Sequence, residues 1–279
     1  MIRKYMIAVV QTNSGTDREA NWKFIADSID EAAARGAKLI SFPEAVSRRR
    51  GGQDDNAPSP ETREDSPTLR LFQQKAKEHG VYIHCGSFGI QTENPEDPRT
   101  YNTTFVVDPQ GEVIAEYHKI HPFDVTLPSG AVAKESSRCK PGSEVVVVDT
   151  ELGKLGLAIC YDIRFPELFR KMTLMGAQLL FNPANFTMVT GKDHWEVLLR
   201  ARALENGCYM VAAGQYGGPV VASFGDSLVV DPWGKVIARA GERTGIIYAD
   251  IDLDYIDEVR RSIGQLHNRR PDTCDTLEA

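Results

Sequence analysis

Glu44, Lys119 and Cys160 are residues of three types that could cooperate in catalysis, and each follows closely on a short, largely apolar segment. The segments are residues 38–42, 112–117 and 155–159. A carboxylate can act as a general base, an ammonium can stabilise an anionic intermediate, and a thiol can act as a nucleophile. If the three segments are strands whose ends meet in space, the sequence predicts a hydrolase that works through a covalent intermediate.

The elements that would position these residues alternate between strand-like and helix-like patterns. Strands are expected at 5–12, 38–42, 81–88, 100–107, 112–117, 144–149, 155–159, 179–182, 209–213, 223–230, 235–240 and 246–252. Helices are expected at 19–35, 66–79, 166–175, 192–206 and from 255 onward. Helical crossovers mixed with hairpins indicate two mixed sheets packed together with helices outside. We therefore expect an α/β fold, a four-layer α-β-β-α sandwich.

The expected domain organisation is one domain over residues 1–279, with 267–279 as a polar, extended C-terminal arm. Two stretches, 47–66 and 120–143, are longer than most connections and are expected to be irregular. Long loops in compact domains are often functional, and one use is as a lid over a site. Both stretches are candidates for that role.

The composition excludes several classes of protein. The 279 residues carry a net charge of −7, which disfavours nucleic acids and anionic membranes as partners. No apolar stretch is long enough to cross a bilayer, and the N-terminal apolar run is short and lacks a cleavage site, so we expect no signal peptide. Five cysteines without CxxC spacing argue against a disulfide framework and favour the cytoplasm.

The histidines give no indication of a metal site. His118 and His121 lie on either side of Lys119, but they are three residues apart on a strand or loop, and no HxH or HExxH pattern accompanies them. We expect no metal and no cofactor, because a nucleophile, a base and a cationic stabiliser are already present.

Around the three catalytic candidates the chain resembles the nitrilase superfamily of carbon–nitrogen hydrolases. The similar motifs are Phe42-Pro43-Glu44, Tyr117-His118-Lys119 and the run from Gly156 to Leu168 (GLAICYDIRFPEL). They occur in the family's order, and the similarity extends from about residue 6 to about residue 272. The resemblance implies the α-β-β-α sandwich and amide chemistry.

The resemblance also implies a role for each residue. Cys160 would be the nucleophile and Glu44 the general base, which takes the thiol proton and later activates water. Lys119 would stabilise the tetrahedral intermediate, with the backbone N–H of Tyr161 as a second donor. Glu135, in Lys134-Glu135-Ser136, resembles the family's second glutamate, which orients the lysine and the substrate.

Cys-Tyr-Asp-x-Arg-Phe-Pro-Glu-Leu is typical of the amidase branches of this family. The segments HWEVLLRARA, VVDPWG and RRPD resemble deaminated glutathione amidases, whereas Phe123-Asp124-Val125 is shared with ω-amidases. The expected substrate is a small ω-amide that bears a carboxylate, with deaminated glutathione or an N-carbamoyl compound as alternatives. Substrate-binding candidates are Tyr161, Arg164, Asn185 and Phe186, although Asn185 and Phe186 belong to a segment, 185–188, that departs from these relatives.

Arg164, Lys192 and the run 48–50 are the candidate cations for a substrate carboxylate, although Asp162 and Arg164 are expected mainly to brace the turn at Cys160. The reaction partners would be the small amide and water. The resemblance further implies a homodimer or higher oligomer, paired through the helix after Cys160.

Two readings without amidase activity remain open. The chain could be an inactive binding protein on the same fold, because folds outlast their chemistry. It could also be a peroxide-sensing protein, which would need a second cysteine near Cys160; the sequence does not place Cys85, Cys139 or Cys208.

Overall fold

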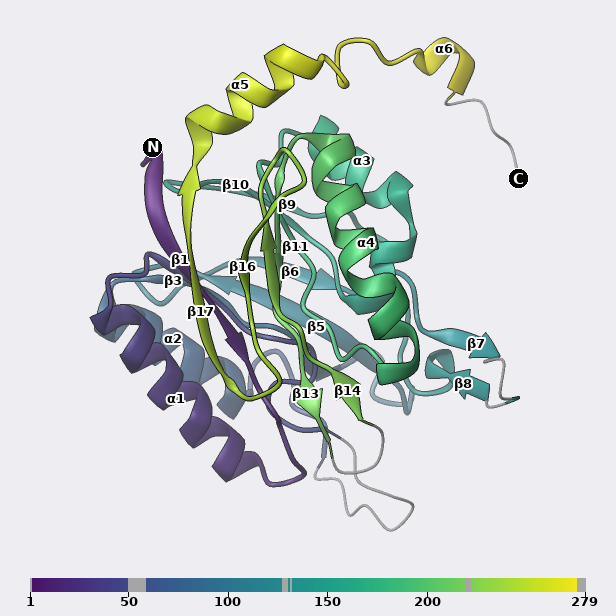
Figure 1. The fold of residues 1–279 in the computed structure, drawn as a ribbon. Coiled ribbons are helices and arrows are strands. Elements are labelled where there is room, and N and C mark those ends of the chain that lie inside the picture. The colour runs from purple at the N-terminus through teal and green to yellow at the C-terminus, as the bar shows by residue number, and fades with distance from the viewer. Residues whose placement is uncertain (1, 50–58, 127–129, 131, 219–221, 275–279) are drawn as a thin grey trace.

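Two β-sheets packed together form the centre of the computed structural model, which describes residues 2–49, 59–126, 130, 132–218 and 222–274 (Figure 1). One sheet contains β1 (Lys4–Gln11), β2 (Leu39–Ser41), β3 (Tyr82–His84), β4 (Phe88–Gln91), β5 (Thr100–Val107), β6 (Val113–His118) and β17 (Gly245–Asp252). The other contains β9 (Val147–Thr150), β10 (Gly153–Leu157), β11 (Leu179–Phe181), β12 (Tyr209–Ala212), β15 (Leu228–Val230) and β16 (Val236–Arg239).

Both sheets are mixed, as the sequence predicts. The first has the order β17-β1-β2-β3-β5-β4, with β6 paired to β5, and the second has the order β16-β15-β12-β11-β10-β9. Strands β1, β2 and β3 run parallel, as do β10, β11 and β12. Parallel neighbours end at a common edge, and that edge carries the catalytic candidates.

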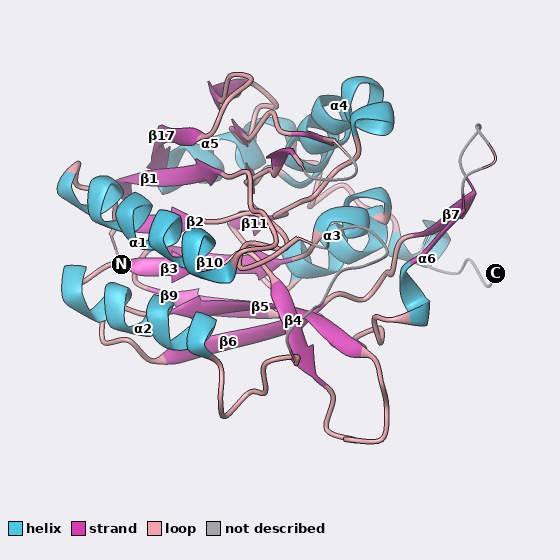
Figure 2. Cartoon of the chain, turned by 90° about the horizontal axis from the view of Figure 1, so that it is seen from below, coloured by secondary structure: helices cyan, strands magenta, loops and turns pink. Residues whose placement is uncertain are grey.

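Helices cover the outer face of each sheet, so the predicted four-layer α-β-β-α sandwich is confirmed (Figure 2). Helices α1 (Arg18–Ala34) and α2 (Pro67–His79) pack on the first sheet, and α3 (Pro166–Leu174) and α4 (Met188–Asn206) pack on the second.

Helix α2 shows how the local sequence sets the two ends of a helix. The Ser66 hydroxyl accepts from the Leu69 N–H at 3.0 Å, and Gly80 ends the helix with a left-handed backbone.

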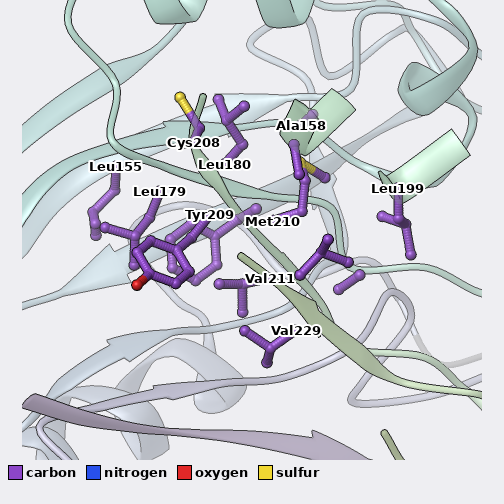
Figure 3. Packing of buried hydrophobic residues seen from close by; sticks show 14 of the residues in the cluster. Leu155, Ala158, Leu179, Leu180, Leu199, Cys208, Tyr209, Met210, Val211 and Val229 are labelled. Carbon is purple, nitrogen blue, oxygen red and sulfur yellow. The ribbon is translucent and has the colours of Figure 1, made fainter. Parts of the chain in front are cut away.

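The core between the sheets and under α3 and α4 is one apolar cluster. Leu155, Leu179 and Val211 are fully buried in it, and Figure 3 shows them beside Met210 and Val229. Complete burial of an aliphatic side chain stabilises the fold by about 1.5–3 kcal/mol. Residues 155–159 show no alternation of polar and apolar side chains because they lie within this buried core.

Two of the expected strands are each broken in two. Residues 81–88 form β3 and the start of β4, separated at Gly86, and residues 223–230 form β14 (Ser223–Phe224) and β15, separated at Gly225. Both glycines have left-handed φ values, 66° and 74°, which interrupt a strand. β14 pairs with β13 (Tyr216–Gly217) and not with either large sheet.

The long stretch 120–143 is more regular than expected. It holds a small hairpin of β7 (Asp124–Thr126) and β8 (Val132–Lys134), followed by the 3₁₀ turn η1 (Glu135–Ser137). The Asp124 carboxylate closes the hairpin by accepting from the Ser136 N–H at 2.9 Å. The hairpin is mostly exposed, so no hydrophobic alternation marks it. In the other long stretch, 47–66, residues 50–58 lie outside the described part.

Near the C-terminus, α5 (Leu253–Ile263) packs Leu253 and Ile256 into the core, and the short helix α6 (Pro271–Cys274) lies apart from the sheets (Figure 1). The expectation of a fully extended arm over 267–279 was wrong at α6, and residues 275–279 lie outside the described part. No helix in the described part of the chain has the length and apolar character needed to cross a membrane.

Candidate active site

The four catalytic candidates lie together beyond the ends of strands from both sheets. Glu44 lies shortly after β2, Lys119 directly after β6, and Cys160 begins the 3₁₀ turn η2 (Cys160–Arg164) after β10. Glu135 begins η1. All four line one cavity of about 650 Å³. The two sheets therefore contribute groups that are far apart in sequence.

Lys119 is the centre of the charged cluster. Its Nζ donates to Glu44 Oε1 at 3.1 Å and to Glu135 Oε2 at 2.8 Å, and the residue is only 1% exposed. Burial opposes its charge, but the two carboxylates outweigh burial and raise the Lys119 pKa well above its usual range. The side chain is therefore a fixed ammonium in a place of low dielectric, where it can stabilise an oxyanion.

The Glu44 carboxylate is held by donors on both oxygens. Oε1 accepts from Asn102 Nδ2 at 2.8 Å as well as from Lys119, and Oε2 accepts from the Asn185 backbone N–H at 2.7 Å. Ala45 next to it has a φ of 56°, an unusual value for a residue with a side chain. The backbone strain and the donors together fix the carboxylate toward the cavity.

Cys160 also has a left-handed backbone, with a φ of 50° at the turn from β10 into η2. The Cys160 N–H donates to the Pro183 carbonyl at 2.9 Å, and Asn182 Nδ2 donates to the Cys160 carbonyl at 3.3 Å. Such strain costs on the order of 1–3 kcal/mol and is found where geometry serves a site. Cys160 is only 8% exposed, and the sharp turn places its thiol on the lining of the cavity.

The thiol of Cys160 is protonated at rest. Burial, and then the neighbouring Glu44 carboxylate, raise its pKa well above the usual range, although Lys119 opposes this. Since the thiolate is the reactive form, attack requires a base. Glu44, which lines the same cavity and whose charge acts on the thiol, can serve as that base.

A buried carboxylate, Asp162, joins the Lys119 segment to the Cys160 turn. Its Oδ2 accepts from Tyr117 Oη at 2.7 Å and from the Ile159 N–H at 2.8 Å. Its Oδ1 accepts from the His121 N–H at 3.1 Å and lies 2.7 Å from His121 Nδ1. Asp162 therefore braces the turn at Cys160 through Tyr117, Ile159 and His121, and it does not pair with Arg164.

Two glycines allow the close backbone contacts behind the site. A Cβ on Gly86 would lie 2.1 Å from the Pro43 carbonyl oxygen, and a Cβ on Gly142 would lie 2.3 Å from the His118 carbonyl oxygen. Gly142 also donates its N–H to the Lys119 carbonyl at 2.9 Å. Side chains at these positions would displace the segments that carry Glu44 and Lys119.

The other predicted site residues divide into two groups. Tyr161, Asn185 and Phe186 line the cavity, and the Tyr161 N–H lies in the first turn of η2, where a helix provides no acceptor. Arg164 and Lys192 are not among the lining residues. The Arg164 guanidinium lies over the Tyr161 and Phe186 rings, at 5.8 and 5.4 Å, and near His194. Arg164 therefore stands behind the cavity wall, and the geometry gives it no direct contact with a ligand there.

Sequence reasoning missed several residues of the site. Asn102, Arg18 and Arg138 line the cavity, and no motif marks any of them. Asn102 faces Glu44 because β5 pairs with β4 and β6, which only the sheet topology reveals. Arg48 and Arg49, from the predicted basic run, do line the cavity, and Arg50 lies outside the described residues.

The other cysteines and the possible metal ligands lie in different parts of the fold. Cys139 lines the same cavity as Cys160, and burial raises its pKa to about 11, whereas Cys85 and Cys208 are fully buried elsewhere. In the described part of the chain, the one group with the spacing of metal ligands is Asp30, Glu78 and His79, on helices α1 and α2. Lys75 already pairs with that group, at 2.7 Å from Asp30.

Sequence comparisons show which known proteins the chain is similar to. Residues 6–261 match the profile of the family described as carbon-nitrogen hydrolase. The chain is 42% identical to deaminated glutathione amidase from Bos taurus, over 98% of this chain and 84% of that protein. It is 39% identical to the nitrilase and fragile histidine triad fusion protein NitFhit from Caenorhabditis elegans, but spans only 61% of that longer protein.

Comparison with solved structures finds proteins of similar fold. The C. elegans NitFhit crystal structure matches with a TM-score of 0.84 at 37% identity, covering 96% of this chain and 66% of that chain. A mutant of the amidase from Nesterenkonia sp. matches with a TM-score of 0.73 at 25% identity, covering 94% and 96% of the two chains. That structure shows covalent addition of the acetamide moiety of fluoroacetamide at its active site cysteine.

Proposed function

The chain belongs to the carbon–nitrogen hydrolase family, and from that premise we propose that it releases ammonia from the terminal carboxamide of a small, carboxylate-bearing ω-amide. It is a hydrolase of carbon–nitrogen bonds other than peptide bonds. The observation that carries the proposal is that Cys160 and Glu44 line one cavity together, with Lys119 Nζ 3.1 Å from the Glu44 carboxylate.

In the first half of the reaction, Glu44 takes the Cys160 proton while Sγ bonds to the amide carbon. The carbonyl oxygen becomes an oxyanion beside the Lys119 ammonium and the Tyr161 N–H. As the carbon–nitrogen bond breaks, the protonated Glu44 carboxyl returns the proton to nitrogen. Ammonia leaves, and a thioester to Cys160 remains.

In the second half, Glu44 takes a proton from water, whose oxygen attacks the thioester carbon. The second oxyanion uses the same donors, and its collapse breaks the carbon–sulfur bond and releases the acid. The protonated Glu44 carboxyl then returns its proton to the Cys160 thiolate. Glu135 acts through Lys119: its Oε2 accepts from Lys119 Nζ at 2.8 Å and from the Phe123 N–H at 2.6 Å. Burial raises the Glu135 pKa, but the Lys119 ammonium and the Phe123 N–H together lower it below its usual range, so the glutamate remains an anion.

Deaminated glutathione is a second candidate substrate. The bovine relative at 42% identity carries that activity in its name, and a cavity of about 650 Å³ can hold a ligand longer than a five-carbon amide. The test is an ammonia assay over α-ketoglutaramate, succinamate, deaminated glutathione, butyramide, N-carbamoyl amino acids and nitriles. We expect turnover of the carboxylate-bearing amides well above butyramide. Equal kcat/KM for succinamate and butyramide would contradict the carboxylate requirement.

We also propose a domain organisation, an assembly and a location for the enzyme. Residues 1–279 would form one catalytic domain, with 267–279 as its C-terminal arm. The surface of α3 and α4 exposes Leu174, Met175, Val197 and Leu204, a concentration of apolar side chains that fits a homodimer interface. The described cysteines Cys85, Cys139, Cys160 and Cys208 are free thiols, which fits the cytoplasm. Light scattering at micromolar concentration tests the assembly, and a monomer would contradict it.

A further inference from the structure

The cavity is larger than its reacting end requires. Cys160, Glu44 and Lys119 need to enclose only a carboxamide, yet the volume of about 650 Å³ lies within the range of sites for drug-sized ligands. The distal part of a substrate must therefore be recognised by other lining residues. If that part carries a carboxylate, a guanidinium is the group best suited to bind it.

Most cations on the lining are already engaged by the protein. Arg49 donates to the Ser14 carbonyl at 2.7 Å, to the Gly217 carbonyl at 2.7 Å and to the Asn13 side chain, so its donors are used. Arg18 pairs with Glu61, with Nη2 3.8 Å from Oε1, although its buried Nε has no hydrogen-bond partner in the described part of the chain. Arg48 also lines the cavity and already has an interaction within the protein. Lys119 belongs to the catalytic cluster.

Arg138 differs from these cations. Within the described part of the chain its guanidinium makes no hydrogen bond and no ion pair. Its backbone is nevertheless held on both sides, because its N–H donates to the Glu135 carbonyl at 3.0 Å and its carbonyl accepts from the Thr100 N–H at 3.0 Å. The Arg138 charge does act on nearby Glu135, whose pKa it helps to lower. An anchored backbone and a guanidinium whose N–H donors have no partner among the described residues are well suited to bind an anionic ligand.

The geometry points to Arg138 as the residue that binds the distal carboxylate of the substrate and so determines specificity. This inference rests on the proposed amidase function and deepens it. It also replaces Arg164 and Lys192, which do not line the cavity, as the carboxylate ligand. Because Arg138 is exposed to solvent, its contact is screened, and we expect a contribution near the low end for a charged hydrogen bond, about tenfold in kcat/KM.

The test measures ammonia release from two isosteric pairs of amides with the full-length enzyme. The short pair is glutaramate and 5-methylhexanamide, in which an isopropyl group replaces the carboxylate. The long pair is N-glutaramoylglycine and N-glutaramoylisobutylamine, which differ in the same way. The ratio of kcat/KM within a pair reports recognition of the carboxylate alone, free of chain length and of the chemical step.

The variants are Arg138→Met, Arg138→Lys and Arg18→Met, with Lys134→Met as the matched control. Lys134 is an exposed cation four residues away on β8 that does not line the cavity. We expect the wild type to favour the carboxylate about tenfold in at least one pair, and less at high salt. Arg138→Met should bring that ratio close to one through KM, Arg138→Lys should keep part of it, and Lys134→Met should leave it unchanged.

The other outcomes separate this inference from the proposed function. If the wild type prefers the carboxylate and Arg138→Met retains that preference, or if Arg18→Met alone removes it, the assignment to Arg138 is overturned while the amidase stands. If the wild type shows no preference in either pair, both the assignment and the carboxylate requirement fail. If no amide in either pair yields ammonia, the proposed function fails with them.

Discussion

At the scale of single residues, the site is organised by charges that share one buried space. The Lys119 ammonium contacts both Glu44 and Glu135, so neither carboxylate can be regarded as independent of it. Burial, and then the Glu44 carboxylate, raise the pKa of the Cys160 thiol, so it stays protonated until a substrate arrives, although Lys119 opposes this shift. An enzyme with this arrangement is set for base-assisted attack and does not hold a preformed thiolate.

Glu44→Gln and Lys119→Ala should each lower kcat by about 100-fold or more, because one removes the base and the other removes oxyanion stabilisation. The losses should not add in the double variant, since both residues act on the same intermediate. Steady-state ammonia release from the three variants gives the comparison. Fully additive losses would show that the two residues serve independent steps.

The residues found by sequence reasoning and those missed differ for a physical reason. Glu44, Lys119 and Cys160 each follow an apolar strand, so chemistry and secondary structure coincide in a short motif. Asn102 lies near the start of β5, and Arg138 follows η1 after a hairpin with no apolar pattern, so nothing local reveals either. Their roles depend on which strands and turns are neighbours, and a single sequence does not contain that information.

At the scale of elements, the important connection is between the end of β6 and the turn η2. Asp162 is fully buried and accepts hydrogen bonds from both sides of Lys119, through Tyr117 and His121, and from Ile159 before the nucleophile. The carboxylate thus sets the distance between the ammonium and the thiol. Without Asp162, the end of β6 and the turn η2 would lack these hydrogen bonds to each other.

Asp162→Asn should lower kcat by on the order of 10-fold or more while KM changes little, because the amide replaces one acceptor by a donor and leaves the distal cavity intact. Tyr117→Phe removes a single donor and should give a smaller loss in the same parameter. Thermal melts of both variants identify any general destabilisation. A change confined to KM, or to the melting temperature alone, would argue against a positioning role.

Element boundaries show where the sequence is ambiguous. The segments 81–88 and 223–230 were each expected as one strand, but left-handed glycines at 86 and 225 divide them. Helix α4 begins at Met188, earlier than expected, because Thr187 caps it by accepting from the Thr190 N–H at 3.4 Å. A glycine or threonine permits several local structures, and tertiary contacts select one.

At the scale of the whole molecule, one buried histidine bridges the two sheets. His84 on β3 stacks on Phe181 of β11 with ring centroids 4.7 Å apart, and its nitrogens lie 3.0 Å from Ser41 Oγ and 3.1 Å from Thr104 Oγ1. Burial lowers the His84 pKa to about 3, so the ring is neutral in the folded protein. In the unfolded chain the ring binds a proton near pH 6.5.

The free energy of unfolding should therefore fall as the pH drops below about 6.5, because the unfolded state binds the proton that the folded state excludes until about pH 3. His84 alone contributes up to about 1.4 kcal/mol per pH unit in this window. Urea denaturation at pH 7, 6, 5 and 4 measures the slope. His84→Gln should be less stable at pH 7 but should lose stability less steeply, and equal slopes for the two proteins would contradict the account.

The central claim is that Cys160 forms a covalent acyl intermediate, and the most direct measurement is ammonia release by Cys160→Ala on the preferred amide, at matched protein concentration. The substitution removes only the sulfur of a small side chain, so the melting temperature should stay close to that of the wild type, which verifies the fold. We predict no ammonia release above the uncatalysed background. Ammonia release near the wild-type rate from a folded Cys160→Ala protein would contradict the covalent mechanism.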